Sequence, residues 1–475
     1  MSRLVVVSNR VARVEEGKST SGGLAVGVLD ALRETGGVWF GWSGEVVERR
    51  PAKPKITQID GLTYATLGLS RDDYEQYYKG FSNRALWPLF HYRVDLTEFQ
   101  REDLAGYHRV NAIFASKLLP LLRPDDLVWV HDYHLIPTGE ALRRSNATQR
   151  LGFFLHTPFP AFEVLATLPS HTDLLRSLCA YDLVGFQTAN DLAAFHDAIV
   201  RGAGGKVLPD GQVHAFGRRL QAAAFPIGVD AATIAEMAPT AERSRTVARF
   251  RQSIVDRQLI VGVDRLDYSK GLTRRFEAYA DFLERFPEHR GHITYLQIAP
   301  PTRTTVFEYR QLRRRLNALA GDIVGRFSEP DWSPIRYLNR SFTRRSLIGF
   351  FRISRIGLVT PLRDGMNLVA KEYVAAQSPE DPGVLILSPF AGAARELDGA
   401  LLANPYDRGA VAEALQRALR MPHVERRERW ESMISVVRNN DVASWREAFL
   451  CALKTTKREA AGLVTSTAQR GKRVA

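Results

Sequence analysis

The sequence predicts an α/β protein built from two doubly wound halves. Short apolar runs alternate with amphipathic segments along most of the chain, which is the pattern of parallel strands covered by helices. The chain has 475 residues, too many for one ordinary hydrophobic core and enough for two. Hydrophobic residues make up 45% of the chain and charged residues 25%, a globular composition that argues against general disorder.

The expected strands are short apolar runs, and the expected helices are longer segments with one apolar face. In the first half the expected strands are Leu4–Ser8, Leu127–His131, Leu151–Leu155 and Asp182–Phe186, and the expected helices are Leu24–Glu34, Asp103–Leu122 and Asp191–Val200. In the second half the expected strands are Leu259–Val263, His292–Gln297, Ile356–Thr360 and Val384–Leu387, and the expected helices are Gly271–Arg285, Arg303–Leu319, Arg344–Ile353, Met366–Gln377 and Ala410–Leu419.

The boundary between the halves is expected at Phe225-Pro226-Ile227-Gly228-Val229-Asp230, where Pro and Gly separate an apolar run from a new helical segment. The predicted domains are therefore residues 1–230 and 231–442, followed by a C-terminal part, 443–475. That part begins with a helix, Ala443–Lys457, for which packing back on the first domain is one option. It ends in a basic tail that we expect to be mobile.

Charge and cysteine content narrow the class of protein. The formal net charge is +13, yet no block of Lys and Arg interleaved with aromatic residues is present, so we expect no nucleic-acid partner. Anionic small substrates are a second use for positive charge. The two cysteines, Cys179 and Cys451, form no disulfide framework or CxxC metal motif. The apolar run near Met1 is too short for a secretory signal, and no segment is long enough to span a bilayer, so we expect a cytoplasmic protein without a membrane partner.

In open α/β sheets, ligands bind at the carboxyl ends of strands, so residues just after each apolar run are the candidate site. Arg10 follows the first run, and Gly22 and Gly23 precede a predicted helix, where backbone N–H groups can approach a phosphate. The spacing does not match the GxGxxG dinucleotide motif, which argues against an NAD dehydrogenase. A flexible loop with a surface arginine explains these residues equally well.

Histidines and one aspartate follow the next two runs of the first half. His131 and His134 lack a third ligand at a known metal spacing, so local hydrogen bonding is the preferred interpretation. Asp132 lies at a strand tip, where it can accept hydrogen bonds from sugar hydroxyls. His156 ends the following run before a stiff Pro-x-Pro turn, which favours a functional role over a buried core histidine.

The second half carries cations and carboxylates at the same kind of position. Arg265 and Lys270 flank a strand-to-helix turn and can clamp a diphosphate, whose negative charge they would stabilise as it departs. Arg303 is a further cation after a strand. Asp364 precedes a helix N-terminus that can direct backbone donors at an anion, and Glu372 follows within that helix, where it can accept from a ribose diol. A capped helix with a structural glutamate explains the last two residues less completely.

Together these motifs resemble the trehalose-6-phosphate synthase family, and the similarity runs from Met1 to about Lys457 in family order. The segments that carry it are Ser8-Asn9-Arg10, Gly22-Gly23-Leu24, Tyr77-Tyr78, Phe81-Ser82-Asn83, Leu86-Trp87-Pro88, His131-Asp132-Tyr133-His134, Arg265-Leu266-Asp267-Tyr268-Ser269-Lys270-Gly271 and Arg363-Asp364-Gly365-Met366-Asn367-Leu368-Val369. The resemblance implies a GT-B fold, in which two Rossmann-like domains face each other across an active-site cleft. It also implies a retaining transfer of glucose from UDP-glucose to glucose 6-phosphate, which yields α,α-trehalose 6-phosphate and UDP.

The resemblance also implies roles for individual residues. The acceptor glucose 6-phosphate would be held by Arg10, Tyr78, Trp87, Asp132 and Arg303. The donor would be held by Gly22, Gly23, Arg265, Lys270, Phe342, Asp364, Leu368, Val369 and Glu372. The catalytic set would be His156, Asp364, Arg265 and Lys270, with Asp364 and His156 touching the transferred glucose.

The mechanism that the resemblance implies is a front-face, ion-pair-like displacement in which the departing phosphate helps to deprotonate the acceptor. It needs cations, orientation and exclusion of water rather than the two carboxylates of a retaining hydrolase. We therefore expect no cofactor and no obligatory metal. The resemblance leaves a homodimer or homotetramer open, and it implies that a separate phosphatase acts next.

Alternatives remain at this stage. The same fold serves glucosylglycerol-phosphate synthase, and the sequence does not identify the donor base, so ADP-glucose or GDP-glucose could replace UDP-glucose. A catalytically silent regulator that binds sugar phosphate is a third possibility, although Arg265, Lys270 and Asp364 are all present.

Overall fold

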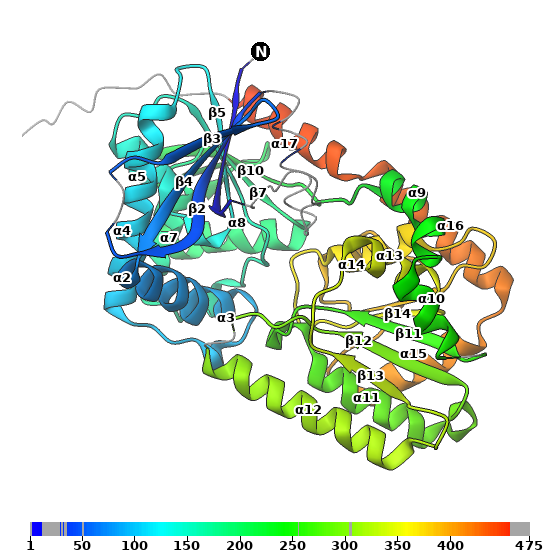
Figure 1. Ribbon diagram of the computed structural model, residues 1–475. Coiled ribbons are helices and arrows are strands. Elements are labelled where there is room, and N and C mark those ends of the chain that lie inside the picture. The colour runs from blue at the N-terminus through cyan, green and yellow to red at the C-terminus, as the bar shows by residue number, and fades with distance from the viewer. Residues whose placement is uncertain are drawn as a thin grey trace, which may run out of the picture.

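The structure, a computed structural model, describes residues 2–11, 29, 32, 36–49, 52–254, 256–303 and 306–456. Two sheets flanked by helices form the two halves of the molecule, from blue to green and from green to orange in Figure 1. The predicted fold class is therefore confirmed: both halves are α/β layers built on mainly parallel sheets. No helix within the described ranges is both long and apolar enough to cross a membrane.

The sheet of the first half has the order β3-β4-β2-β1-β5-β6-β7-β10-β9-β8. Its centre is parallel, and its two edges, β3 against β4 and β8 to β10, are antiparallel, which the sequence patterns did not predict. The strands are β1 (Leu4–Arg10), β2 (Val38–Val47), β3 (Lys55–Ile59), β4 (Leu62–Ser70), β5 (Leu127–His131), β6 (Arg150–Phe154), β7 (Leu183–Phe186), β8 (Lys206–Val207), β9 (Gln212–Ala215) and β10 (Arg218–Ala224).

The helices of the first half cover this sheet and carry one unusual segment. They are α2 (Arg71–Asp73), α3 (Trp87–Phe90), α4 (Arg101–Leu118), α5 (Thr138–Arg144), α6 (Phe162–Leu165), α7 (His171–Leu178) and α8 (Ala189–Ala203). Between α2 and α3 the chain forms a π-helix, Tyr74–Leu86, which packs on α4. Wide π turns are rare and frequently occur at functional sites, and this one carries Tyr78 and leads directly into Trp87.

The sheet of the second half is parallel throughout, with the order β13-β12-β11-β14-β15-β16. This is the strand order of a Rossmann domain, whose ligand crevice lies where the order reverses, here between β11 and β14. The strands are β11 (Gln258–Val263), β12 (Ile293–Ile298), β13 (Ile335–Leu338), β14 (Ile356–Val359), β15 (Val384–Leu387) and β16 (Leu401–Leu402). The helices are α9 (Ala231–Glu242), α10 (Arg245–Gln252), α11 (Leu272–Arg285), α12 (Phe307–Phe327), α13 (Arg344–Arg352), α14 (Leu368–Ala376), α15 (Arg408–Arg420) and α16 (His423–Asn439).

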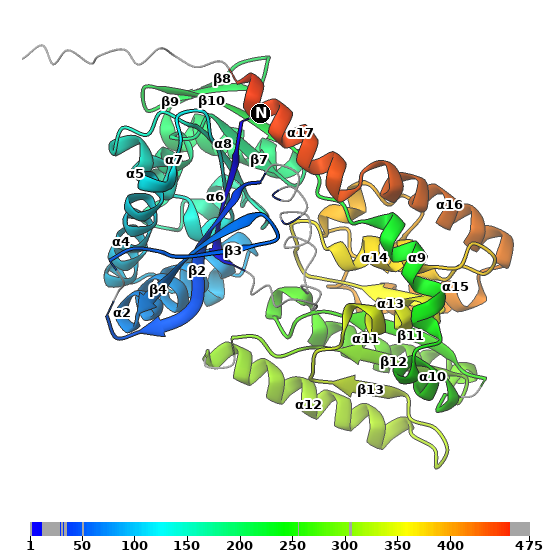
Figure 2. The ribbon, with the colours of Figure 1, turned by 45° about the horizontal axis from the view of Figure 1, so that its top comes forward.

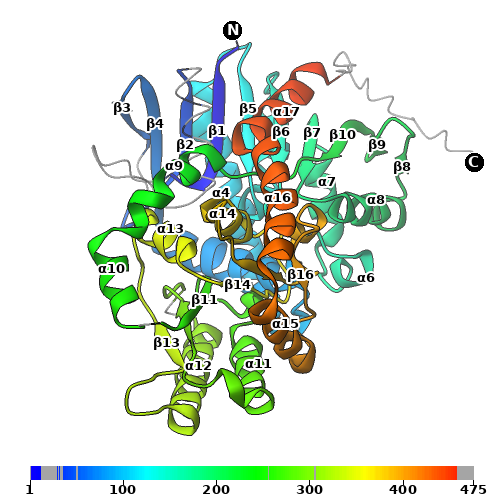
Figure 3. The ribbon, with the colours of Figure 1, turned by 90° about the vertical axis from the view of Figure 1, so that its right-hand side faces the viewer.

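The chain crosses between the halves twice. After α16 it returns to the first half as α17 (Val442–Thr455), the red helix at the upper edge of Figure 2. The indole ring of Trp129 on β5 lies 4.6 Å from the Phe449 ring and 4.9 Å from the Trp445 ring, measured between centroids. Figure 3 shows α16 and α17 following one another along the molecule. Helix α17 is thus part of the first half's core.

The two crossings touch each other beside α14. A Cβ on Gly228 of the first crossing would lie 2.0 Å from the carbonyl oxygen of Asn440 in the second, so only glycine permits this approach. Lys371 of α14 is buried; its Nζ donates to the carbonyl of Ile227 at 2.9 Å and pairs with Glu396 at 2.7 Å. The predicted domain limits of 1–230, 231–442 and 443–475 remain predictions, and the chain beyond residue 456 lies outside the described residues.

Candidate active site

Seven of the predicted site residues lie at or just beyond the carboxyl ends of strands in the two sheets. Arg10 ends β1, Asp132 follows β5 and His156 follows β6 in the first half. In the second half, Arg265 and Lys270 follow β11, Arg303 follows β12 and Asp364 follows β14. Gly22 and Gly23 lie outside the described residues.

Aromatic rings form the first-half wall around Arg10 and Tyr78. The Cζ of Arg10 lies 5.8 Å from the centroid of the Trp42 ring, and the Trp42 and Tyr78 ring centroids are 5.4 Å apart. The Tyr78 ring also stacks on the His134 ring, with the centroids 5.9 Å apart. Sequence reasoning missed Trp42, because β2, the strand that carries it, was not predicted. The exposed Arg10 guanidinium therefore lies against a ring surface that can support a bound sugar.

Asp132 and His156 meet at the tips of β5 and β6. Asp132 has φ of 76° and ψ of 163°, a backbone conformation that is costly for a residue with a side chain, and such strain is concentrated at functional sites. Its Oδ1 accepts from the His156 backbone N–H at 3.3 Å. Burial raises the pKa of Asp132 to about 6.

His156 is an uncharged imidazole. Its Nε2 lies 3.0 Å from Nδ1 of His131, and its Nδ1 lies 3.5 Å from Nε2 of Gln187. Burial lowers the pKa of His156 to about 3, so the ring is neutral near pH 7 and can offer a hydrogen bond without a charge. This end of the first half therefore combines neutral imidazoles with a carboxyl group of raised pKa.

Lys270 and Asp364 form an ion pair in the second half. The Lys270 Nζ donates to Asp364 Oδ2, which also accepts from Asn367 Nδ2 at 3.0 Å. Burial acts to raise the pKa of Asp364, but Lys270 lowers it below its ordinary value, so this carboxylate is ionised. The predicted diphosphate cation and the predicted sugar-contacting carboxylate are thus held together.

A buried arginine fixes the turn that carries Lys270. Arg275 of α11 donates to Asp264 Oδ2 at 2.6 Å, to Thr360 Oγ1 at 2.9 Å and to the Lys270 carbonyl at 3.3 Å. Its side chain is fully buried beneath the ends of β11 and β14. The backbone of the predicted phosphate clamp is therefore anchored to the sheet.

The two halves are in contact at the site. A Cβ on Gly365 would lie 2.1 Å from the His156 carbonyl oxygen, so the turn after Asp364 packs directly on the His156 loop. Nearby, the guanidinium groups of Arg265 and Arg303 lie 5.6 and 4.2 Å from the centroid of the Trp87 ring. Arg303 also donates to the Tyr133 hydroxyl at 3.3 Å. Residues predicted to bind donor and acceptor therefore face one another across the junction.

Helix α14 carries the predicted nucleotide contacts. It begins at Leu368 after Asn367, whose side chain accepts from the Ala370 N–H at 3.3 Å and whose φ is 71°. Leu368 and Val369 are half-buried in its first turn. One turn further, burial raises the pKa of Glu372 to about 7, with Arg344 opposing the shift.

Phe342, the remaining predicted donor contact, precedes α13 and is half-buried against the core cluster that also includes α14 residues. Its ring meets the Phe350 ring at 5.6 Å in an edge arrangement.

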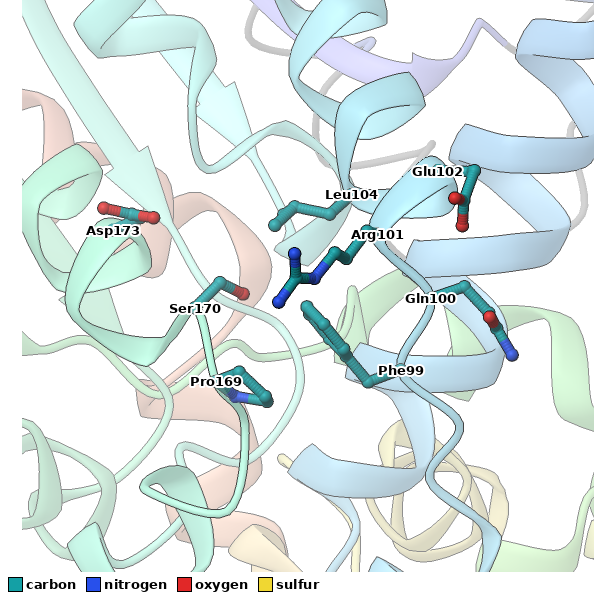
Figure 4. A pocket seen from close by; sticks show the side chains of 8 residues that line it. All are labelled: Phe99, Gln100, Arg101, Glu102, Leu104, Pro169, Ser170 and Asp173. Carbon is teal, nitrogen blue, oxygen red and sulfur yellow. The ribbon is translucent and has the colours of Figure 1, made fainter.

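A surface hollow lies outside the predicted site, and the described side chains also decide whether the requirements of a metal site are met. The surface hollow in Figure 4 lies between the start of α4 and the start of α7, where Phe99, Arg101, Ser170 and Asp173 line it, and it contains none of the predicted site residues. Among the described residues, no group of three or more His, Cys, Asp or Glu side chains is arranged to hold a metal ion. Our expectation that the chemistry requires no metal stays a prediction.

The structure adds residues to which the sequence assigned no role. Asp267, Tyr309 and His91 are buried among the predicted site residues. The His91 ring lies 4.1 Å from the Trp87 ring, and burial lowers its pKa to about 4. The position of Asp267 inside the Arg265–Gly271 motif was the one feature of the sequence that could have indicated a role for it. Tyr309 lies in a helical segment, and nothing in the sequence distinguishes it from other tyrosines.

Comparison with known proteins places this geometry in context. The model of glycosyltransferase family 20 matches residues 2–455. A trehalose-6-phosphate synthase of Cronobacter sakazakii is 51% identical over 454 residues, covering 96% of this chain and 95% of the relative. A crystal structure of an alpha,alpha-trehalose-phosphate synthase (UDP-forming) from Burkholderia xenovorans in complex with glucose-6-phosphate is 53% identical with a TM-score of 0.92, covering 95% of this chain and 100% of that one. An E. coli structure described as trehalose-6-phosphate bound with UDP-2-fluoro glucose is 48% identical with a TM-score of 0.90, covering 96% and 99%.

Proposed function

The chain belongs to glycosyltransferase family 20, and from this membership we propose that it transfers glucose from UDP-glucose to glucose 6-phosphate, with retention of configuration, to form α,α-trehalose 6-phosphate and UDP. A relative named trehalose-6-phosphate synthase is 51% identical to this chain over nearly its whole length. Two solved structures of this fold hold glucose-6-phosphate and UDP-2-fluoro glucose, respectively. The observation on this chain that carries the proposal is the meeting of Asp364 and its turn with the His156 loop, which brings the predicted glucose contacts of both halves together.

The donor occupies the second half in this proposal. Arg265 and Lys270 bind the diphosphate, and the start of α14 with Leu368 and Val369 seats the nucleotide, whose ribose diol is bound by Glu372. Phe342 and the Gly22-Gly23 backbone complete the donor site. Fixed cations lower the barrier because they stabilise charge that develops on the leaving phosphate, without reorganising during the reaction.

The acceptor occupies the first half and takes one residue from the second. Arg10, Tyr78, Trp87 and Asp132 surround glucose 6-phosphate, and Arg303 reaches it across the junction. In the reaction the bond between the anomeric carbon and the UDP oxygen breaks, the acceptor oxygen bonds to that carbon on the same face, and its proton passes to the departing phosphate. His156, being neutral, and Asp364, held by Lys270, orient the glucose that is transferred.

The test is direct. Purified protein is mixed with UDP-glucose and glucose 6-phosphate, UDP release is followed, and the sugar product is identified by mass and NMR. UDP release that depends on the acceptor, with an α,α-1,1-linked disaccharide phosphate as product, is the expected result. If nucleotide is released only when ADP-glucose or GDP-glucose is the donor, or only when glycerol 3-phosphate is the acceptor, those compounds replace the substrates named here. If no donor and acceptor pair gives nucleotide release, only the binding of sugar phosphate remains as a function.

The product still carries a phosphate, so we propose that a separate phosphatase consumes it. The oligomeric state of the protein stays a prediction.

A further inference from the structure

The buried carboxylate of Asp267 accepts hydrogen bonds from residues of both halves of the molecule. Its side chain is fully buried, and its Oδ1 accepts from the Ser269 N–H and hydroxyl, both at 3.0 Å. The indole N–H of Trp87 lies 3.4 Å from the same oxygen. Since Trp87 belongs to α3 of the first half and Asp267 follows β11 of the second, this contact spans the junction.

The other oxygen of Asp267 faces Arg303. Oδ2 accepts from Arg303 Nη1 at 3.1 Å and from the Tyr309 hydroxyl at 3.0 Å, and Arg303 also contacts that hydroxyl. Only 8% of the Arg303 side chain is exposed. Burial acts to raise the pKa of Asp267, but Arg303 and Arg265 lower it to about 2, so the carboxylate is charged throughout the physiological range.

The Arg303 side chain needs these hydrogen bonds to hold its orientation, because no helix or strand fixes the backbone at this position. It lies in the loop between β12 and α12, with φ of 46°, rather than in a regular element. A long side chain leaving a loop loses much rotamer freedom when it is held in one place, and that cost falls on binding unless the protein has already fixed the side chain. Asp267 and Tyr309 fix Nη1, which leaves the guanidinium face against Trp87 and its Nη2 on Tyr133.

We propose that Asp267 is a positioning residue that orients Arg303 toward the phosphate of the acceptor sugar, and that Tyr309 assists it. This inference rests on the proposed function. In this inference Asp267, which lies in the same Arg265–Gly271 motif as the predicted donor residues Arg265 and Lys270, controls recognition of the acceptor. It does so through Arg303, the one predicted acceptor residue that the second half contributes.

The chain offers a matched control in Asp264. That aspartate is equally buried and pairs with an arginine, Arg275, at 2.6 Å, but the hydrogen bonds described for Arg275 all end on second-half residues. Loss of either carboxylate leaves a buried arginine without its ion-pair partner, which destabilises a protein. A role in acceptor positioning, in contrast, belongs to Asp267 alone.

The experiment measures KM for both substrates in Asp267→Asn, Asp264→Asn and Tyr309→Phe. For Asp267→Asn we expect KM for glucose 6-phosphate to rise about tenfold or more while KM for UDP-glucose stays within about twofold. Tyr309→Phe, which keeps the ring and loses only the hydroxyl, should change the same KM in the same direction by a smaller factor. Asp264→Asn should lower the melting temperature without a selective rise in the acceptor KM. Circular dichroism and a cooperative thermal transition show which variants are folded.

A double-mutant cycle separates positioning from a structural role. If Asp267 acts through Arg303, Asp267→Asn should add less than about twofold to the acceptor KM on an Arg303→Ala background. An unchanged or lowered KM for glucose 6-phosphate in Asp267→Asn, equal rises for both substrates, or full additivity in the cycle would each overturn the inference. Wild-type protein that releases no UDP from these substrates would overturn the proposed function as well, so the two failures are distinguishable.

Discussion

The two sides of the site differ in the kind of chemistry they present. The first half supplies rings and uncharged groups: Tyr78, Trp87, His134 and His156, with burial lowering the pKa of both histidines. The second half supplies fixed charges, and the pKa values of Asp267 and Asp364 lie below the ordinary range. Burial is deep on both sides, so the presence or absence of a buried counter-ion accounts for the difference.

This difference suggests a division of labour. Rings and neutral hydrogen-bonding groups suit a sugar, which has apolar faces and hydroxyl groups but no charge at the carbon that reacts. Fixed ion pairs suit a diphosphate, whose charge grows as it leaves. Two arginines depart from the pattern: Arg10 is a cation on the first-half side, and Arg303 extends from the second half toward Trp87 and Tyr133. Both are predicted to bind the acceptor phosphate.

The strongest test of the charged side is Arg265→Ala. The substitution removes a cation that we place on the leaving diphosphate, so kcat should fall by about a hundredfold or more, with a smaller effect on KM. UDP release under saturating substrates measures it. Arg326→Ala, on the exposed face of α12, is the control and should turn over normally. Near-normal turnover in Arg265→Ala would remove that residue from the mechanism.

Arg10→Ala tests whether Arg10, the cation on the first-half side of the site, binds the acceptor. KM for glucose 6-phosphate should rise by about tenfold while KM for UDP-glucose changes little, because the Arg10 guanidinium lies over the Trp42 ring beside Tyr78, which we place at the acceptor. Initial rates over a grid of both substrate concentrations separate the two constants. Equal effects on both would mean that Arg10 does not belong to the acceptor site.

The neutral histidines predict how stability responds to acid. Burial holds the pKa of His131 far below 6.5, so the unfolded chain binds a proton that the folded chain does not. The His131 contribution therefore makes the free energy of unfolding fall as pH drops below about 6.5, by up to about 1.4 kcal/mol per pH unit. The pKa of Asp267, about 2, acts in a lower window: its stabilisation is lost only between pH of about 3.8 and 2.

Denaturant unfolding of His131→Asn between pH 7 and pH 5 measures the first of these effects. The variant should show a shallower loss of stability with acid than the wild-type protein. His423→Asn, at an exposed position, should keep the wild-type slope. Parallel pH profiles for His131→Asn and wild-type protein would show that His131 binds its proton equally in the folded and unfolded states, against this prediction.

The smallest expected effect concerns Glu372. Burial raises its pKa to about 7, and the ionised form is the better acceptor for a ribose diol. UDP-glucose binding should weaken a few-fold as pH falls from about 8 to 6 in the wild-type protein, and Glu372→Gln should bind more weakly with little pH dependence. Calorimetric titration with UDP-glucose measures this without the acceptor. A wild-type profile that is flat across this range would contradict the role.

The sequence predicted the fold best where a short apolar run forms a buried strand. Leu127–His131 and Val384–Leu387 were predicted with the observed bounds, and the predicted site residue Asp132 directly follows the first of them. The predicted helix Arg303–Leu319 is wrong at both ends, because α12 runs from Phe307 to Phe327 and leaves Arg303 in a loop. The strands β2 to β4 and the π-helix were missed because aromatic and polar residues obscure their periodicity.

Contacts between distant segments were beyond sequence reasoning. Lys270 and Asp364 were predicted separately, and nothing in either motif shows that they form a pair. Asp267 was visible in its motif but without a role, since its partners Trp87, Arg303 and Tyr309 come from three other segments. The pairings within the second half depend on which strands are neighbours in its sheet, and the Trp87 contact depends on how the two sheets are juxtaposed; local patterns determine neither.

The return of α17 has a consequence for how the protein is made. Synthesis proceeds from the N-terminus, yet Trp129 and Phe154 of the first half are covered by Trp445 and Phe449, which are synthesised after the strands and helices of the second half. The first sheet therefore emerges from the ribosome with an aromatic face that α17 covers later, a condition that favours aggregation of incomplete chains. A stop codon shortly before α17 would accordingly damage the half that is made first, and leave the β11–β16 sheet with its own complement of helices.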